Sequence, residues 1–205
     1  MLDKLFYKIL DNIFYILLLF IAFIIFKNLI FMQKERMSDK LFKYFIKSNN
    51  DEFIWQTRQI LNNSSVNQTH NIQEVLNENN ADITIELKPR EELSRLYRDP
   101  TYYPGTKKEI FYSFTVYSSH PIKIFIDEIN WIHGVTESGL TIPEYRKYVI
   151  QHEFMHALGY DHQPCNTTTA TNGRCPIMYQ STIGCPEGFK CGYNISAADY
   201  TKRLY

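Results

Sequence analysis

Hydrophobic and polar residues follow two different patterns, one near the N-terminus and one in the rest of the chain. Residues 13–26 are an unbroken apolar run, which only Lys27 and Asn28 interrupt before it continues to Phe31. At a helical rise of ~1.5 Å per residue, residues 13–31 would extend across roughly the ~30 Å hydrocarbon core of a bilayer. Lys27 can reach toward the headgroups. This pattern predicts a single-pass membrane helix.

The predicted organisation is a membrane anchor at residues 1–32, a linker at 33–38 and a folded domain at 39–205. A buried core helix and a cleaved signal peptide are the alternatives for the apolar run. Helices of globular domains usually keep a polar face, which this run lacks, and no small-x-small cleavage site follows it. We therefore expect a retained anchor.

The domain shows a mixed pattern of strands and helices. In residues 81–87, ADITIEL, every second side chain is apolar, as in a half-buried strand. Residues 51–61 place apolar side chains at helical spacing, with acids in the first turn. The prolines between residues 88 and 108 indicate a long loop. Further strands are expected at residues 41–46, 110–117 and 122–126.

One helix has both of its ends marked in the sequence. Thr141 and Glu144 have the spacing of a capping box. Gly159 is the natural end, because glycine adopts the left-handed conformation without a Cβ penalty. Between these ends, a step of four places His152 and His156 on the same face.

Charge and cysteine content narrow the function classes and the compartment. Lys plus Arg number 22 and Asp plus Glu number 22, so no basic excess indicates a nucleic-acid partner. Lys and Arg after the apolar run favour a cytosolic domain by the positive-inside rule. The four cysteines, all in the last fifth of the chain, are instead typical of an exoplasmic segment with disulfides. Because long domains translocate against the charge bias, we expect an exoplasmic or lumenal domain.

The sequence HEFMHALGYDH, residues 152–162, carries the candidate chemistry. His152 and His156 can direct imidazole nitrogens at one cation ~2.0 Å away. Glu153 is rotated by about 100° from His152 around the helix, which suits a general base acting on a water at the metal. Gly159 lets the chain turn so that His162 supplies a third ligand. Three histidines with a fourth position open to water form the catalytic kind of zinc site.

The competing interpretation is a polar helix face, which two histidines alone would not exclude. The added spacing of the glycine and the third histidine favours Zn²⁺. His70, His120 and His133 lack ligand-like spacing and are not expected to bind it. The cysteines, spaced by ten, ten and six residues, lack the C-x₂₋₄-C pairs of a zinc site, which leaves disulfides or free thiols.

Residues 152–162 resemble the H-E-x-x-H-x-x-G-x-x-H signature of the metzincin zinc metallopeptidases, and most closely the matrixin branch. Met178 lies sixteen residues beyond His162, where a Met-turn is expected. The resemblance implies an α+β domain with a twisted mixed β-sheet, an active-site helix and a loop-rich C-terminal subdomain. It also implies that Met178 lies beneath the metal, that Tyr179 helps form a pocket wall, and that residues 110–117 are the substrate-binding edge strand. A weaker resemblance is to metzincin-like domains of bacterial secreted proteins.

The sequence also departs from the family pattern. No cysteine-switch segment and no Asp-rich calcium loops are evident. Met155 stands where the matrixin motif has a small residue. Gln180 stands where astacin-like members carry a tyrosine ligand, so we expect no fifth protein ligand.

These observations predict a membrane-anchored, zinc-dependent metalloendopeptidase in which Glu153 is the general base. The substrate is expected to be an extended polypeptide that adds to an exposed strand edge. The alternatives are a non-catalytic binding module with the same fold, and a zinc amide hydrolase that acts on a non-protein substrate.

Overall fold

The computed structural model describes residues 40–99 and 112–201. The segment from Leu41 onward forms one compact unit. The anchor predicted over residues 1–32 and the linker at 33–38 lie outside the described residues. Within the described part of the chain, no helix has both the length and the apolar character needed to cross a bilayer.

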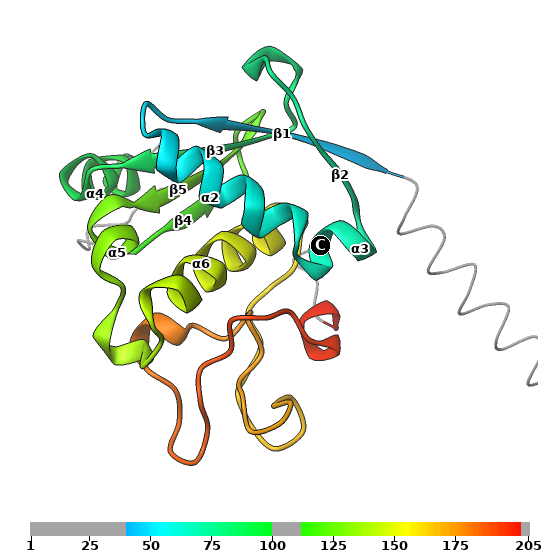
Figure 1. The fold of residues 1–205 in the computed structure, drawn as a ribbon, viewed down its shortest axis with the longest axis vertical. Helices are drawn as coiled ribbons and strands as arrows, with labels where there is room; N and C mark the ends of the chain where they lie inside the picture. The colour runs from blue at the N-terminus through cyan, green and yellow to red at the C-terminus, as the bar shows by residue number, and fades with distance from the viewer. Residues whose placement is uncertain (1–39, 100–111, 202–205) are drawn as a thin grey trace, which may run out of the picture. The chain divides into compact units, whose positions relative to one another are not determined.

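A five-stranded mixed sheet forms the centre of the domain, with strand order β2-β1-β3-β5-β4 (Figure 1). Strands β2, β1, β3 and β5 pair in parallel, while β4 pairs antiparallel with β5 and lies at the edge. Their bounds are β1 Leu41–Lys47, β2 Asn71–Glu74, β3 Ile83–Lys88, β4 Phe114–Val116 and β5 Ile122–Asp127. The predicted α+β class with a mixed sheet is thereby confirmed.

Helices cover both faces of the sheet. Alternate residues of β5 point to opposite sides, so that Ile124 and Ile126 belong to the main core whereas Phe125 packs with Leu93 in a smaller cluster. The main core lies between the sheet and the helices α2 and α6, and the smaller cluster lies beneath α4. The helices are α2 Asp51–Asn62, α3 Ser65–Thr69, α4 Arg90–Arg98, α5 Glu128–His133 and α6 Ile142–Ala157.

The sequence interpretation was wrong about the loop at residues 88–108, because α4 occupies part of it. Pro89 does not break this helix but precedes it as the N-cap residue. Acids occupy the first turn of α4 and arginines the last, which complements the helix dipole. Leu93 is fully buried. Leu96 and Tyr97, three and four residues after Leu93, pack against the same cluster, so the helix is fixed by one apolar face and by charge placement.

Other elements differ from the prediction in extent or were not predicted. Of the strand expected at 110–117, residues 112–117 are described, and β4 covers Phe114–Val116 among them. Strand β2 and the short helices α3 and α5 were not predicted. Four short 3₁₀ helices complete the described structure: η1 Glu78–Asn80, η2 Thr136–Ser138, η3 Ser181–Ile183 and η4 Ala197–Tyr200.

Helix α6 agrees closely with its prediction. Thr141 and Glu144 form the capping box. The last helical residue is Ala157, and Gly159 follows with φ of 89°, the left-handed backbone that lets the chain turn away. The helix packs against β4 and β5, so the sheet edge and the C-terminal loops lie beside its histidines.

Candidate metal centre

Three histidines from two segments meet at the C-terminal part of α6. His152 and His156 come from the helix, and His162 comes from the loop that follows the turn at Gly159. The Nε2 atom of His162 lies 3.1 Å from that of His156 and 3.3 Å from that of His152. Their candidate ligand atoms lie within 4.8 Å of one another, so the three side chains could hold one metal ion.

Backbone carbonyls orient two of these rings. His152 Nδ1 lies 2.6 Å from the carbonyl oxygen of Ile177, and His156 Nδ1 lies 2.8 Å from that of Tyr160. A carbonyl oxygen only accepts, so each Nδ1 must carry the proton and donate it. Each Nε2 then presents its lone pair to the centre of the cluster, as metal-binding histidines require.

The donor set fits zinc. Three nitrogens bound tetrahedrally at ~2.0–2.1 Å from Zn²⁺ would lie about 3.3 Å apart, close to the two separations observed here. Burial, together with the neighbouring His162, lowers the pKa of His156 to about 4. Burial and both neighbouring histidines likewise hold the pKa of His152 well below its usual range. Both imidazoles are therefore neutral near pH 7, which is the form that binds a metal.

Glu153 lies beside the cluster but is not part of it. Burial raises the pKa of its carboxyl to about 7, while a hydrogen bond from Thr115 opposes that rise. The hydroxyl Oγ1 of Thr115 lies 2.8 Å from Oε2 of Glu153 and 3.0 Å from the Glu153 carbonyl oxygen. A carboxyl with a pKa near neutrality can both accept and return a proton, as a general base and acid must.

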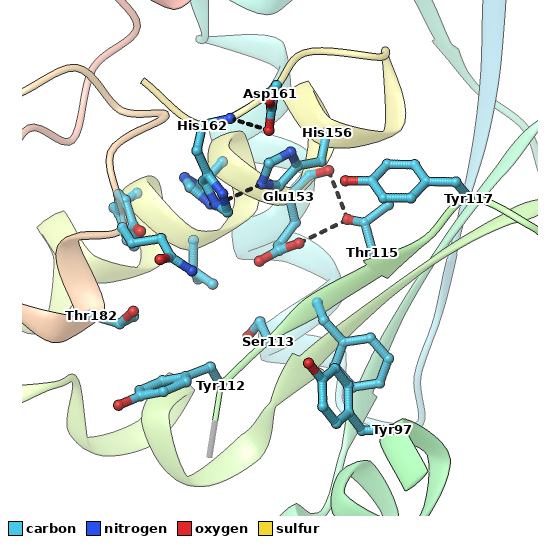
Figure 2. A pocket seen from close by; sticks show the side chains of 15 residues that line it. Tyr97, Tyr112, Ser113, Thr115, Tyr117, Glu153, His156, Asp161, His162 and Thr182 are labelled. Atoms are coloured by element: carbon cyan, nitrogen blue, oxygen red, sulfur yellow. Dashed lines mark hydrogen bonds between the residues drawn. The ribbon is translucent and has the colours of Figure 1, made fainter. Parts of the chain in front are cut away.

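A cleft of about 240 Å³ opens over the histidines. Figure 2 shows it between the edge strand, which carries Thr115, and the C-terminal loop, which carries Thr182, with α6 beneath. Glu153 and Asp161 contribute carboxylates to the lining, and no Lys or Arg of the described residues lines it. Much of the remaining surface is aromatic, and its tyrosines are Tyr97, Tyr112, Tyr117 and Tyr148.

The predicted Met-turn is held by a buried carboxylate. Met178 is fully buried, and its N–H donates to Asp199 Oδ1 at 2.7 Å. Asp199 also accepts from the N–H and the hydroxyl of Ser196, at 2.7 and 2.8 Å. Ile177 precedes Met178, and the Ile177 carbonyl contacts His152. Asp199 therefore supports the histidine cluster from the C-terminal segment.

Tyr179 contributes its backbone near the cleft. Its carbonyl accepts from the Tyr148 hydroxyl at 3.2 Å and from the Ser181 N–H at 2.8 Å. Its side chain is not among the described residues that line the cleft, where Gln180 and Thr182 form that wall. The pocket-wall role of Tyr179 stays a prediction from the family resemblance.

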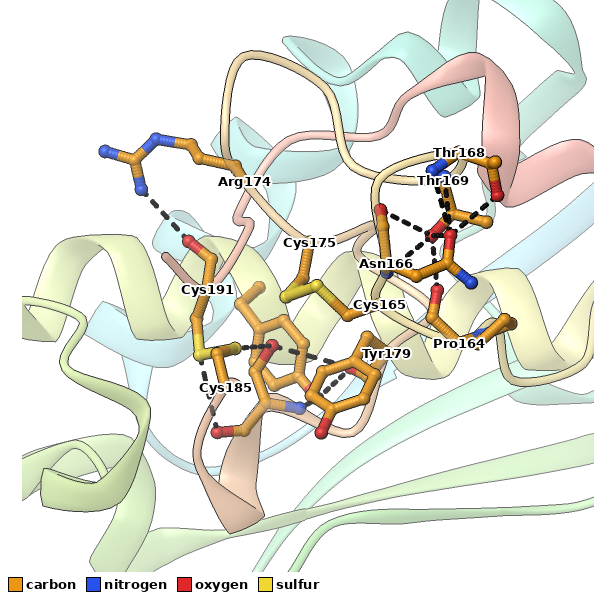
Figure 3. Close-up of a disulfide and its surroundings, with 12 residues drawn as sticks. Pro164, Cys165, Asn166, Thr168, Thr169, Arg174, Cys175, Tyr179, Cys185 and Cys191 are labelled. Atoms are coloured by element: carbon orange, nitrogen blue, oxygen red, sulfur yellow. Dashed lines mark hydrogen bonds between the residues drawn. A yellow bond between two sulfur atoms is a disulfide. The ribbon is translucent and has the colours of Figure 1, made fainter. Parts of the chain in front are cut away.

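All four cysteines form disulfides, Cys165–Cys175 and Cys185–Cys191, and no free thiol remains (Figure 3). The interpretation as disulfides is confirmed, and it settles the pairing that the sequence left open. The two bonds lie on either side of Met178 in the chain. They close two loops that contain no helix or strand, and the segment between these loops carries η3 and Ile177, whose carbonyl contacts His152. The two bonds therefore constrain both ends of the segment that supports His152.

Three supporting residues were missed from the sequence. Thr115 and Tyr148 carry no motif, and Asp199 belongs only to a local capping box with Ser196. Each of the three supports the site through a partner at least 21 residues away in the chain. The single available signal was the alternation in residues 110–117, which places Thr115 and Tyr117 on the same side of a strand.

A family model described as "Protein of unknown function (DUF3152)" matches residues 47–197. This stretch includes the three histidines, Glu153 and both disulfides. No curated protein matches the chain.

Proposed function

Given that the chain belongs to the DUF3152 family, we propose that it is a zinc-dependent metallopeptidase. The observation that carries the proposal is a buried carboxylate, Glu153, beside three convergent histidines at the base of an open cleft. The resemblance of residues 152–162 to the metzincin signature supports the same assignment. A binding module would need neither a base with a pKa near 7 nor a threonine that orients it.

His152, His156 and His162 would hold the ion, and Zn²⁺ would polarise the scissile carbonyl and make a water molecule more acidic. Glu153 accepts a proton from the attacking water, whose oxygen forms a bond to the carbonyl carbon. The same carboxyl then returns the proton to the amide nitrogen as the carbon–nitrogen bond breaks. Thr115 keeps the carboxylate turned toward the cleft during both transfers.

An extended polypeptide is the substrate class that best suits the cleft. Strand β4 ends the described sheet, so its outer edge can pair with an added strand. This arrangement favours a peptide over a compact non-protein amide. The carboxylates of Glu153 and Asp161, without a cation in the described lining, would disfavour acidic side chains near the scissile bond.

We also propose an exoplasmic or lumenal location for the domain. The two disulfides support it, because such bonds persist in oxidising compartments. The membrane anchor at residues 13–31 stays a prediction from the sequence.

The test is zinc content and cleavage of a diverse peptide library by the full chain in detergent, beside Glu153→Gln. Both proteins should bind one equivalent of zinc. The variant should cleave about 10²–10⁴-fold more slowly, because it keeps the ligands and loses the base. Zinc in both proteins with cleavage by neither would refute peptidase activity, and a lack of zinc in both would refute the metal site.

A further inference from the structure

Tyr117 is the first residue after β4, and it lines the cleft. Its ring centroid lies 6.3 Å from that of His156, with the two rings nearly perpendicular at 85°. In Figure 2 the Tyr117 side chain extends from the strand toward His156 and Glu153, and its hydroxyl is at the end of the side chain that points to these two residues. The tyrosine thus faces the metal cluster from the wall opposite the C-terminal loops.

Strand and helix run side by side here, and this fixes what Tyr117 faces. On the strand, Thr115 contacts Glu153 of the helix. Tyr117 follows Thr115 by two residues and faces His156, which follows Glu153 by three residues. Two residues of a strand span about 6.6 Å and three residues of a helix about 4.5 Å, so the pairs stay roughly in step. Thr115 therefore lies beside the candidate base, and Tyr117 lies beside His156, one of the three candidate metal ligands.

A hydrogen-bond donor at that place would add to the stabilisation that Zn²⁺ would give the carbonyl oxygen. When the water oxygen bonds to the carbonyl carbon, the carbonyl π electrons move to the carbonyl oxygen, which becomes negatively charged. Before the proton transfer, the Glu153 carboxylate can only accept a hydrogen bond. After the transfer, it holds the proton that it returns to the amide nitrogen. The Tyr117 side chain, which faces His156 from the cleft wall, carries such a donor in its hydroxyl.

We propose that the Tyr117 hydroxyl donates a hydrogen bond to the carbonyl oxygen of the scissile bond as that oxygen becomes negatively charged. Tyr117 keeps its own proton throughout, and the proton delivered to the leaving amine comes from Glu153. This inference rests on the proposed peptidase function and adds a catalytic residue to it. Neither the metal-binding motif nor the family match includes an assignment for this tyrosine.

The experiment compares Tyr117→Phe with Tyr112→Phe in the full zinc-loaded chain. Tyr112 precedes β4, lines the same cleft and is 39% exposed, against 36% for Tyr117. Each variant loses one phenol hydroxyl and keeps its ring. The measurements are kcat, KM, zinc content and the affinity for a phosphinic peptide, whose tetrahedral anion imitates the charged carbonyl oxygen.

We expect Tyr117→Phe to lower kcat about 10²-fold, the loss typical of removing one such donor, with zinc content and KM unchanged. Its affinity for the phosphinic peptide should fall by a similar factor. Tyr112→Phe should act on KM alone.

Other outcomes overturn the proposal in separate ways. Wild-type kcat and phosphinic affinity in Tyr117→Phe would remove Tyr117 from the mechanism and leave the peptidase function intact. Loss of zinc from Tyr117→Phe would make it a structural support of the metal site. An equal loss of kcat in both variants would indicate a general effect of cleft hydroxyls. If the wild-type protein binds zinc but cleaves no peptide, the proposed function itself fails, and this inference fails with it.

Discussion

Replacing Thr115 by valine tests how the structure controls the proposed general base. Valine has nearly the shape of threonine but lacks the hydroxyl that contacts Glu153. That hydrogen bond stabilises the charged carboxylate, so its removal raises the pKa of Glu153 further. The basic form of Glu153 then appears only at higher pH, and the acidic limb of the activity profile moves in the same direction.

The magnitude follows from the environment of the bond. Thr115 is 3% exposed, and its Oγ1 lies 2.8 Å from the Glu153 carboxylate, so solvent does not replace the lost donor. A hydrogen bond to a charged group contributes about 1.5–3 kcal/mol, and ~1.36 kcal/mol corresponds to one pKa unit. We expect the acidic limb to move upward by about 1–2 pH units.

The assay is the pH dependence of kcat/KM for a cleaved peptide, which reports ionisations of the free enzyme. Thr115→Ser is the matched control, because it keeps the hydroxyl and should leave the limb close to its wild-type position. Carbon NMR of labelled glutamate carboxyls gives the same pKa without turnover. Superimposed profiles of the wild-type protein and Thr115→Val would refute the argument that this contact sets the ionisation of Glu153.

Two further predictions concern the support of the cluster and its protonation. Asp199→Ala should destabilise the fold by about 1–3 kcal/mol, because it leaves the buried Met178 N–H unpaired. The same variant should also weaken zinc binding, because the Ile177 carbonyl that contacts His152 is next to Met178. Urea unfolding measures the stability and a zinc titration measures the affinity. An unchanged zinc affinity would contradict the proposed support of His152 by Asp199. In metal-free Glu153→Gln, stability should fall as the pH decreases from about 6.5 to about 4, since the unfolded chain then binds protons that folded His156 does not. Urea unfolding across this pH range measures the slope of stability against pH. The slope should become shallower when His156→Gln is added to the variant. Equal slopes with and without His156→Gln would show that His156 is not the source of the pH dependence.

The sequence alone determined the metal-binding motif and the helix that carries most of it. Ligand spacing at four residues, a capping box and a terminal glycine are local features, and local backbone geometry converts them directly into positions. His152 and His156 therefore lie where the sequence placed them, and His162 follows the turn at Gly159. The even number of clustered cysteines similarly indicated disulfides.

Only the tertiary structure decided what surrounds this motif. Strand order, the contact between Thr115 and Glu153, and the hold of Asp199 on Met178 join residues that are far apart in the chain. No spacing rule relates such residues, because the packing of the sheet, α6 and the C-terminal loops brings them together. Helix α4 was missed for a different reason: its apolar residues Leu93, Leu96 and Tyr97 lie in a proline-bounded segment that was interpreted as a loop, and the sheet residues they pack against are distant in the chain. The positions of the candidate metal ligands are thus encoded locally, whereas the environment around them is a product of the fold.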